Sequence, residues 1–274
     1  GPVRGVLCVE RRFRSSFLRT CITAYAGSAE LRYDYEIDWH EHNLFVKAEH
    51  PVEVNAKYAS YDIQFGHIQR PVHKNTLWDF ARFEVCGHKY ADLSDGGFGL
   101  ALLSDCKYGY DASRSSLNLS LLKCSTYPDK NADIGQHRFA YALYPHGGDL
   151  TEGRVREHGY AFNYPAQAAF VPAQTGSLPS EFSLFRLSAP NIVLETVKKA
   201  EDSDALVLRM YEAENKRTQC VLTTGLAFGL CEEADLMERP TQPLAQTPAG
   251  IPLMFRPFEI KTVLLHPKAD TQPD

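Results

Sequence analysis

The sequence predicts an all-β protein, because three features of its 274 residues point the same way. Apolar and polar residues alternate with a period of two in many short segments, as they do in half-buried strands. Turn-forming residues separate these segments at nearly regular intervals. Aromatic residues, which are enriched in strands, make up 11% of the chain, with 14 Tyr and 15 Phe. We therefore expect β-sandwich architecture.

The clearest strand covers 29–40. Its odd positions, from Ala29 to Trp39, are apolar, and its even positions, from Glu30 to His40, are polar. Successive side chains of a strand point to opposite faces, so this segment has one buried and one solvated face. In chain order, the first part of the sequence is predicted to form strands at 5–13, 17–25, 29–40, 44–48, 52–56, 58–65, 80–86, 99–104, 116–123 and 138–144.

The alternation fails between 164 and 180, where Pro165, Pro172 and Pro179 occur together with Gly176. Proline removes backbone donors and is typical of linkers. Strand patterns resume at 182–187, 192–197, 205–212, 218–224 and 258–265, with a loop expected over 240–252. We therefore expect a first domain over 3–165, a linker over 166–180 and a second domain over 181–267.

The composition argues against two kinds of partner. The net charge is −5, so the chain has no global basic field to attract nucleic acid or an anionic membrane. No apolar run approaches the ~20 residues that span a bilayer, and no signal peptide is visible. The chain lacks an initiator Met and begins with Gly1-Pro2, a pair typical of the scar that a protease leaves when it cuts a tag from a recombinant protein, so we expect a fragment of a longer protein.

The seven cysteines are odd in number and form no CxxC pair, so they do not indicate a disulfide scaffold. We expect reduced, buried thiols, as in a cytosolic protein. The cysteines are Cys8, Cys21, Cys86, Cys106, Cys124, Cys220 and Cys231.

Three small groups of residues are candidates for metal binding or acid–base catalysis. His40 and His42 would share one face of a strand within reach of a metal ion, although a solvated pair at a strand end is the favoured interpretation. Asp92 and Asp95 are paired carboxylates of the kind glycosidases need, in a cluster of Asp, Ser and Gly that a turn also requires. Asp133 and His137 could form an acid–base pair, but their spacing is weak support.

A longer run of motifs is more specific. It reads QFGHIQRPVH at 64–73, NTLWDFARFEV at 75–85, HKY at 88–90, DLS at 92–94, GFGLALL at 97–103 and DCKYG at 105–109. ADIGQH at 132–137 and FAYALYPH at 139–146 follow, and VLETVK at 193–198, LVLRMYEA at 206–213 and PFEIK at 257–261 lie in the second part. Together they resemble the C-terminal half of the class II α-mannosidases, glycoside hydrolase family 38, and most closely its cytosolic type and vacuolar relative.

The resemblance implies a galactose-mutarotase-like β-sandwich, complete or truncated, followed by a smaller β-sandwich. It also implies a parent enzyme that hydrolyses terminal α-D-mannose from free oligosaccharides with retention of configuration. In this family the nucleophilic Asp, the acid/base Asp and a divalent metal, zinc or cobalt, lie in an N-terminal catalytic domain, which a helical bundle follows.

This chain matches neither of those domains. The resemblance therefore assigns it no catalytic residue and no metal ligand, and the chain alone is expected to be inactive. The implied partners are the catalytic domain and helical bundle of the same parent chain and a mannose-containing oligosaccharide, with no nucleic acid and no membrane. The implied location is the cytoplasm, with the vacuole or lysosome as the alternative.

The resemblance also implies that one loop of the large sandwich approaches the substrate pocket. The segment 87–97 is the best candidate, and its polar side chains would bind sugar hydroxyls or else brace the loop. These residues are His88, Lys89, Asp92, Ser94 and Asp95. The run 70–82, with Trp78, Asp79 and Arg82, is expected to hold buried structure around an Arg–carboxylate pair.

A second hypothesis comes from a different class of function. The chain could be a stand-alone carbohydrate-binding or scaffolding module that uses exposed aromatic residues for stacking. A large exposed apolar patch would instead mark an interface with missing domains.

Overall fold

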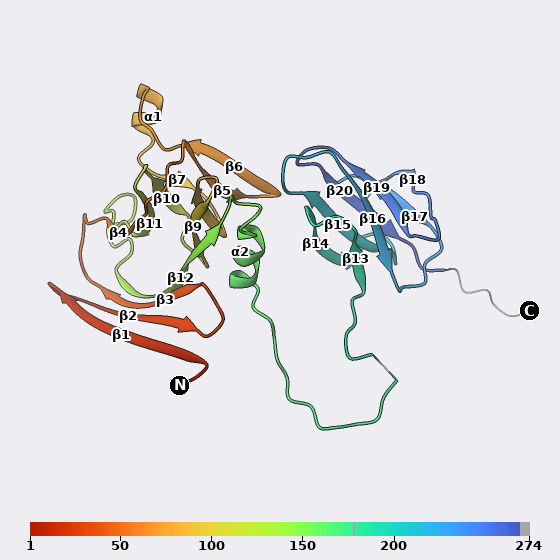
Figure 1. Ribbon diagram of the computed structural model, residues 1–274, viewed down its shortest axis with the longest axis horizontal. Coiled ribbons are helices and arrows are strands. Elements are labelled where there is room, and N and C mark those ends of the chain that lie inside the picture. The colour runs from red at the N-terminus through yellow and green to blue at the C-terminus, as the bar shows by residue number, and fades with distance from the viewer. Residues whose placement is uncertain (178, 269–274) are drawn as a thin grey trace, which may run out of the picture. The chain divides into compact units, whose positions relative to one another are not determined.

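A computed structural model describes residues 1–177 and 179–268 (Figure 1). The chain divides into two compact units. The first comprises Gly1–Ile63 and Ile68–Ala169, and the second comprises Gln64–His67 and Phe170–Asp274. The predicted linker, 166–180, includes Leu178, which lies outside the described residues. In the described part of the chain, neither helix is long and apolar enough to cross a bilayer.

The first unit is built on an eight-stranded antiparallel sheet with the order β1-β2-β3-β12-β9-β8-β5-β6. In that order its strands are β1 (Arg4–Phe13), β2 (Ser16–Tyr25), β3 (Leu31–Trp39), β12 (Gly135–Gly147), β9 (Phe98–Ser104), β8 (Tyr90–Ser94), β5 (Tyr58–Ile63) and β6 (Gly66–Pro71). The alternating segment at 29–40 forms β3, whose Ile37 and Trp39 are 3% and 2% exposed. The predicted burial of its odd face holds at this end of the strand.

A four-stranded sheet completes the first sandwich. Its order is β4 (Val46–Pro51), β11 (Ser116–Leu122), β10 (Gly109–Ala112) and β7 (Val85–Cys86). The core draws buried residues from both sheets, including Tyr61, Tyr110 and Leu119. Tyr141 stacks on Tyr33 with ring centroids 4.8 Å apart, so aromatic pairs supply part of the packing.

Two short helices accompany the strands of this unit. α2 (Val155–Asn163) places buried Val155 in a small cluster with Tyr90, Ala101 and Leu103 of the eight-stranded sheet. α1 (Leu77–Ala81) buries none of its residues. Its N-cap is Thr76, whose side-chain oxygen accepts a hydrogen bond from the Asp79 amide at 3.1 Å.

The second unit contains two further antiparallel sheets. One has the order β13 (Phe185–Leu187), β16 (Thr218–Thr224) and β19 (Ile251–Phe255). The other has the order β14 (Ile192–Lys199), β15 (Leu206–Glu212), β20 (Ile260–Leu265), β17 (Cys231–Ala234) and β18 (Pro240–Pro243). One core cluster joins both sheets, with Leu208 and Met210 from β15 and Leu222 and Phe255 from the smaller sheet.

The predicted all-β class is confirmed, and three of the expected elements are wrong. The segment 52–56 is irregular, and the expected strand at 80–86 is the end of α1 followed by the two-residue β7. The expected loop at 240–252 contains β18 and the start of β19. The run 70–82 is not buried as a whole, because the side chains of α1 face solvent: Leu77, Trp78 and Phe80 are 87%, 80% and 59% exposed.

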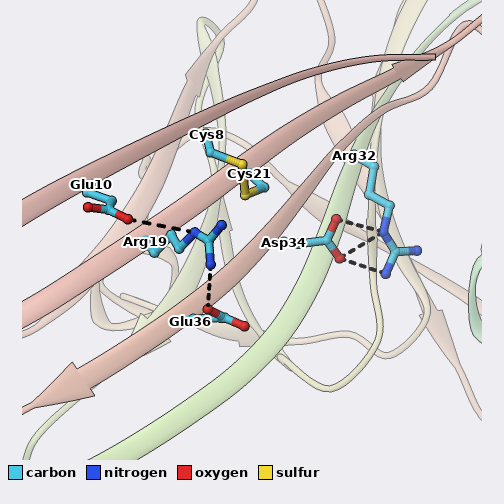
Figure 2. Close-up of a disulfide and its surroundings, with 7 residues drawn as sticks. All are labelled: Cys8, Glu10, Arg19, Cys21, Arg32, Asp34 and Glu36. Atoms are coloured by element: carbon cyan, nitrogen blue, oxygen red, sulfur yellow. Dashed lines mark hydrogen bonds and ion pairs between the residues drawn. A yellow bond between two sulfur atoms is a disulfide. The ribbon is translucent and has the colours of Figure 1, made fainter. Parts of the chain in front are cut away.

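The expectation of reduced, buried cysteines is also wrong for part of the set. Cys8 and Cys21 form a disulfide that joins β1 to β2 (Figure 2). The pairing register sets these two residues directly opposite each other, so their side chains meet across the strands. Arg19 beside them pairs with Glu10 and Glu36, at 3.9 and 3.5 Å. Cys86 and Cys106 are free and exposed, and Cys124, Cys220 and Cys231 are free and buried.

Candidate functional site

The segment 87–97 is a strand between two turns and not a single loop. β8 is an interior strand, paired with β5 on one side and β9 on the other. His88 and Lys89 precede it, and Ser94 and Asp95 stand at its far end. At about 3.3 Å per residue, these two groups lie about 16 Å apart, so the polar side chains of 87–97 do not extend from one loop.

Asp92 lies in the middle of this segment and is buried. Its carboxylate oxygen Oδ1 lies 2.8 Å from Nε2 of His146 on β12, and both side chains are 1% exposed. The second oxygen accepts a hydrogen bond from the Ser94 hydroxyl at 2.8 Å. Asp92 and Ser94 thus share a buried polar cluster with His146.

Two glycines leave room for the His146 ring. A Cβ atom added at Gly99 or at Gly153 would overlap that ring. Nδ1 of His146 lies 3.2 Å from the carbonyl oxygen of Gly147, so both ring nitrogens face acceptors and the ring is suited to carry two protons. Burial acts to lower the pKa of His146, but the hydrogen bond to Asp92, the charges of Asp92 and Asp149 and the carbonyl of Gly147 together outweigh it, so the pKa is raised.

Asp95 organises the turn between β8 and β9. Its Oδ1 accepts hydrogen bonds from the amides of Gly97 and Phe98, at 2.9 and 3.1 Å, and its Oδ2 accepts one from Asn55 at 3.3 Å. These backbone donors hold the pKa of Asp95 below its ordinary value. A carboxylate engaged in this way shapes a turn.

The side chain of Lys89 contacts charged and aromatic partners, whereas the ring nitrogens of His88 make no hydrogen bond within the described residues. The Lys89 ammonium lies 3.7 Å from Asp62 and 4.5 Å from the centre of the Tyr160 ring, and its side chain is 21% exposed. The half-buried His88 ring contacts Tyr108, with centroids 5.4 Å apart. Within the described residues, no side-chain or backbone group hydrogen-bonds the ring nitrogens of His88.

Sequence reasoning missed His146 and Asp62 as members of this region. His146 is 54 positions from Asp92 and Asp62 is 27 positions from Lys89, so no local spacing links them. Asp62 occupies the polar face of its strand pattern, together with Ser60 and Gln64, so nothing in the pattern predicted that it is only 3% exposed. Once buried, a carboxylate requires a partner.

The other two candidate pairs do not form the sites that the sequence suggested. β3 ends at Trp39, so His40 and His42 follow the strand and are exposed, with His40 lying 3.1 Å from Asp38. The Asp133 carboxylate accepts from the amides of Lys123 and Cys124, while His137 contacts the Asp133 carbonyl oxygen. Among the residues that the structure describes, no group of three or more His, Cys, Asp or Glu could hold a metal ion.

Comparison with known proteins places this arrangement in a family. Residues 1–131 match the model of the glycosyl hydrolases family 38 C-terminal domain. Residues 191–263 match the model of the glycosyl hydrolases family 38 C-terminal beta sandwich domain. An alpha-mannosidase structure from Enterococcus faecalis shares the fold, with a TM-score of 0.77 and 17% identity, over 97% of this chain and 34% of that one.

Three curated relatives are named as α-mannosidases. Alpha-mannosidase 2C1 of Homo sapiens is 44% identical over 87% of this chain and 23% of its own length. Alpha-mannosidase G of Dictyostelium discoideum is 38% identical over 96% of this chain and 25% of its own. Alpha-mannosidase of Saccharomyces cerevisiae is 34% identical over 84% of this chain and 23% of its own. The chain thus spans about a quarter of these relatives, and it belongs to glycosyl hydrolase family 38, whose C-terminal domains it matches.

Proposed function

We propose that this chain is the non-catalytic C-terminal portion of an enzyme that hydrolyses terminal α-D-mannose from free oligosaccharides in the cytoplasm. One observation carries the proposal: both matched family models describe C-terminal domains, and the relatives named α-mannosidase are about four times as long. The hydrolysis would proceed with retention of configuration and with a divalent metal, zinc or cobalt. The catalytic residues and the metal site would lie in the remaining part of the parent enzyme.

The carboxylates of the candidate site support a non-catalytic role. A retaining glycosidase needs one carboxylate as nucleophile and a second about 5 Å away as acid/base. Asp92 is buried against His146, and both oxygens of Asp95 accept backbone hydrogen bonds. Neither is placed to attack a sugar, so we expect the chain alone to be inactive.

A supporting role is favoured by apolar surface on the first unit. Leu77, Trp78 and Phe80 of α1 are exposed, and nine of the ten residues of the edge strand β1 are exposed. Contiguous exposed apolar side chains on a monomer mark interaction sites. We propose that α1 docks onto the catalytic domain or the helical bundle of the parent chain.

Among the five candidate residues, His88 is best suited to contact the substrate. Its ring is half-buried, and the described residues leave its two nitrogens available to a sugar hydroxyl. We propose that Lys89, Asp92, Ser94 and Asp95 contribute by fixing the two ends of β8, because their polar groups already bind protein partners.

Hydrolysis of a chromogenic α-mannoside, measured with zinc and with cobalt, tests the proposal. The full parent enzyme should be active and this chain inactive with either metal. His88→Ala in the parent should lower kcat/KM by about tenfold, since one hydrogen bond to substrate is lost, while the exposed residue change His42→Ala should leave it unchanged. Metal-dependent hydrolysis by this chain alone would contradict the division of roles.

A binding experiment tests the proposed docking of α1 separately. Trp78→Ala together with Phe80→Ala should weaken the association of this chain with a separately produced N-terminal part, measured by analytical ultracentrifugation. Saturable binding of mannose oligosaccharides by this chain alone, with no association between the two parts, would favour the stand-alone carbohydrate-binding module.

A further inference from the structure

A small cationic cavity lies within the first unit, away from β8. It encloses about 200 Å³ beside the end of β6, the loop that follows it and α1. Tyr61, Arg70, His73, Lys74, Asp79 and Arg82 are among its lining residues. A volume of this size is below that of drug-sized ligand pockets, so it suits a small group.

Two buried nitrogen atoms of residues that line the cavity have no hydrogen-bond partner in the described part of the chain. Nη1 of Arg70 and Nδ1 of His73 are both buried, and neither has a hydrogen-bond partner among the described residues. The nearest carboxylate oxygen to His73 Nδ1 is Asp79 Oδ2 at 3.7 Å, which is too long for a hydrogen bond. A buried guanidinium nitrogen without an acceptor is costly, so an anion in the cavity would offset that cost by compensating the charge of Arg70.

The Arg70 guanidinium is held in place without being neutralised. It lies over the ring of the buried Tyr61, 4.9 Å from the ring centre. Burial lowers the pKa of Arg70, and the neighbouring Arg82 lowers it further. The planar guanidinium is therefore oriented while its hydrogen bonds remain to be made, which is the arrangement that binds oxyanions.

The carboxylates that line the cavity are already engaged. Asp111 pairs with Lys47 and accepts a hydrogen bond from Asn118 at 2.8 Å. Asp79 accepts from the Thr76 hydroxyl at 2.9 Å and forms a loose pair with Arg82 at 3.7 Å. Arg70 and Lys74 thus have no carboxylate partner in the described part of the chain, and positive charge is in excess.

We propose that this cavity is an oxyanion-binding site, in which Arg70, assisted by His73, Lys74 and Arg82, binds a carboxylate or phosphate group. Such a group carries negative charge and two or three acceptor oxygens, which complement the cationic side chains of the wall. The site uses only side chains of this chain, so it stands independently of the mannosidase assignment.

Stabilisation by added anions tests the proposal. The midpoint of thermal unfolding of this chain, followed by Trp fluorescence, should rise saturably with inorganic phosphate and with acetate, compared with chloride at equal ionic strength. Arg70→Gln and Arg82→Gln should raise the apparent Kd for phosphate by about tenfold or more. Arg138→Gln is the matched control, because this arginine is 83% exposed and does not line the cavity.

A direct measurement covers the case in which Arg70→Gln does not fold. Phosphorus NMR of inorganic phosphate should show saturable line broadening with the unaltered chain, reduced by Lys74→Gln, whose side chain is exposed. No broadening and no stabilisation beyond chloride, or full retention of both effects in folded Arg70→Gln, would overturn the site and leave a cavity filled with water.

The same titration on the full parent enzyme identifies the source of the anion. Stabilisation of this chain but not of the parent means that a carboxylate of the remaining protein fills the cavity. Stabilisation of both means that the site binds a free small anion. Both outcomes require the oxyanion site, and neither depends on whether the parent is catalytically active.

Discussion

The buried pair of Asp92 and His146 gives the most direct test of this structure. Asp92→Asn keeps the size of the side chain but removes the charge that His146 faces at 2.8 Å, in a place where both side chains are 1% exposed. Removing one partner of a buried ion pair costs about 3–5 kcal/mol, because the other charge is left without compensation. The free energy of unfolding of the first unit should fall by that amount.

Urea unfolding followed by Trp fluorescence measures the change. Both tryptophans, Trp39 and Trp78, lie in the first unit, so the signal reports that unit alone. The chain offers a matched control in Asp38, which lies 3.1 Å from His40 with both side chains nearly half exposed. Asp38→Asn should cost no more than about 1 kcal/mol. If Asp92→Asn costs no more than Asp38→Asn, the buried pair does not stabilise the fold as described.

The same pair predicts a pH dependence. The pKa of His146 is raised in the folded state, so the folded protein holds this proton more tightly than the unfolded chain. The resulting stability is complete below the ordinary histidine value of about 6.5 and is lost as pH rises through the raised pKa. Asp92→Asn should abolish this loss, whereas Asp38→Asn should retain it.

Three further predictions concern other parts of the chain. Gly99→Ala should destabilise the first unit by about 1–3 kcal/mol, since its Cβ would overlap His146, while Gly147→Ala, which meets open space, should change stability by less than about 0.5 kcal/mol in the same urea assay. Burial lowers the pKa of His50 to about 4, so the stability it contributes is present above pH 6.5 and decreases by about 3 kcal/mol as pH falls to 4; His50→Asn should flatten this pH profile. Glu212 is fully buried, and although burial acts to raise its pKa, hydrogen bonds from Phe258, Asn191, Glu214 and Lys216 lower it overall. Glu212→Gln should lower the free energy of unfolding of the second unit, measured by circular dichroism, by about 3 kcal/mol, and exposed Glu201→Gln should lower it by less than about 0.5 kcal/mol.

The sequence was a good guide wherever one face of a strand meets solvent. The alternation at 29–40 identified β3 because its polar positions are at least partly accessible. β8 was missed because Tyr90, Ala91, Asp92 and Leu93 are all buried, so alternation is absent and its Asp and Ser are typical of turns. α1 was read as part of a strand, although Thr76 and Asp79 form a helix start three residues apart.

The candidate site was predictable only in part, for a related reason. The motif run singled out the segment 87–97 as a loop and did not identify β8 within it, and the state of each side chain depends on long-range partners. Asp92 meets His146 only because β9 lies between β8 and β12 in the sheet and Gly99 leaves a gap. No spacing along the chain encodes that contact.

The pairing of β1 with β2 makes the oxidation state of two cysteines informative about the cellular compartment. Cys8 and Cys21 are directly opposite in the ladder, so their sulfur atoms can join or separate without any change in strand pairing. Cytosolic glutathione and thioredoxin keep such thiols reduced, whereas oxidising compartments preserve the bond. The oxidation state of this pair in protein rapidly acid-quenched from cells therefore serves as a built-in reporter of compartment, readable from one peptide by mass spectrometry.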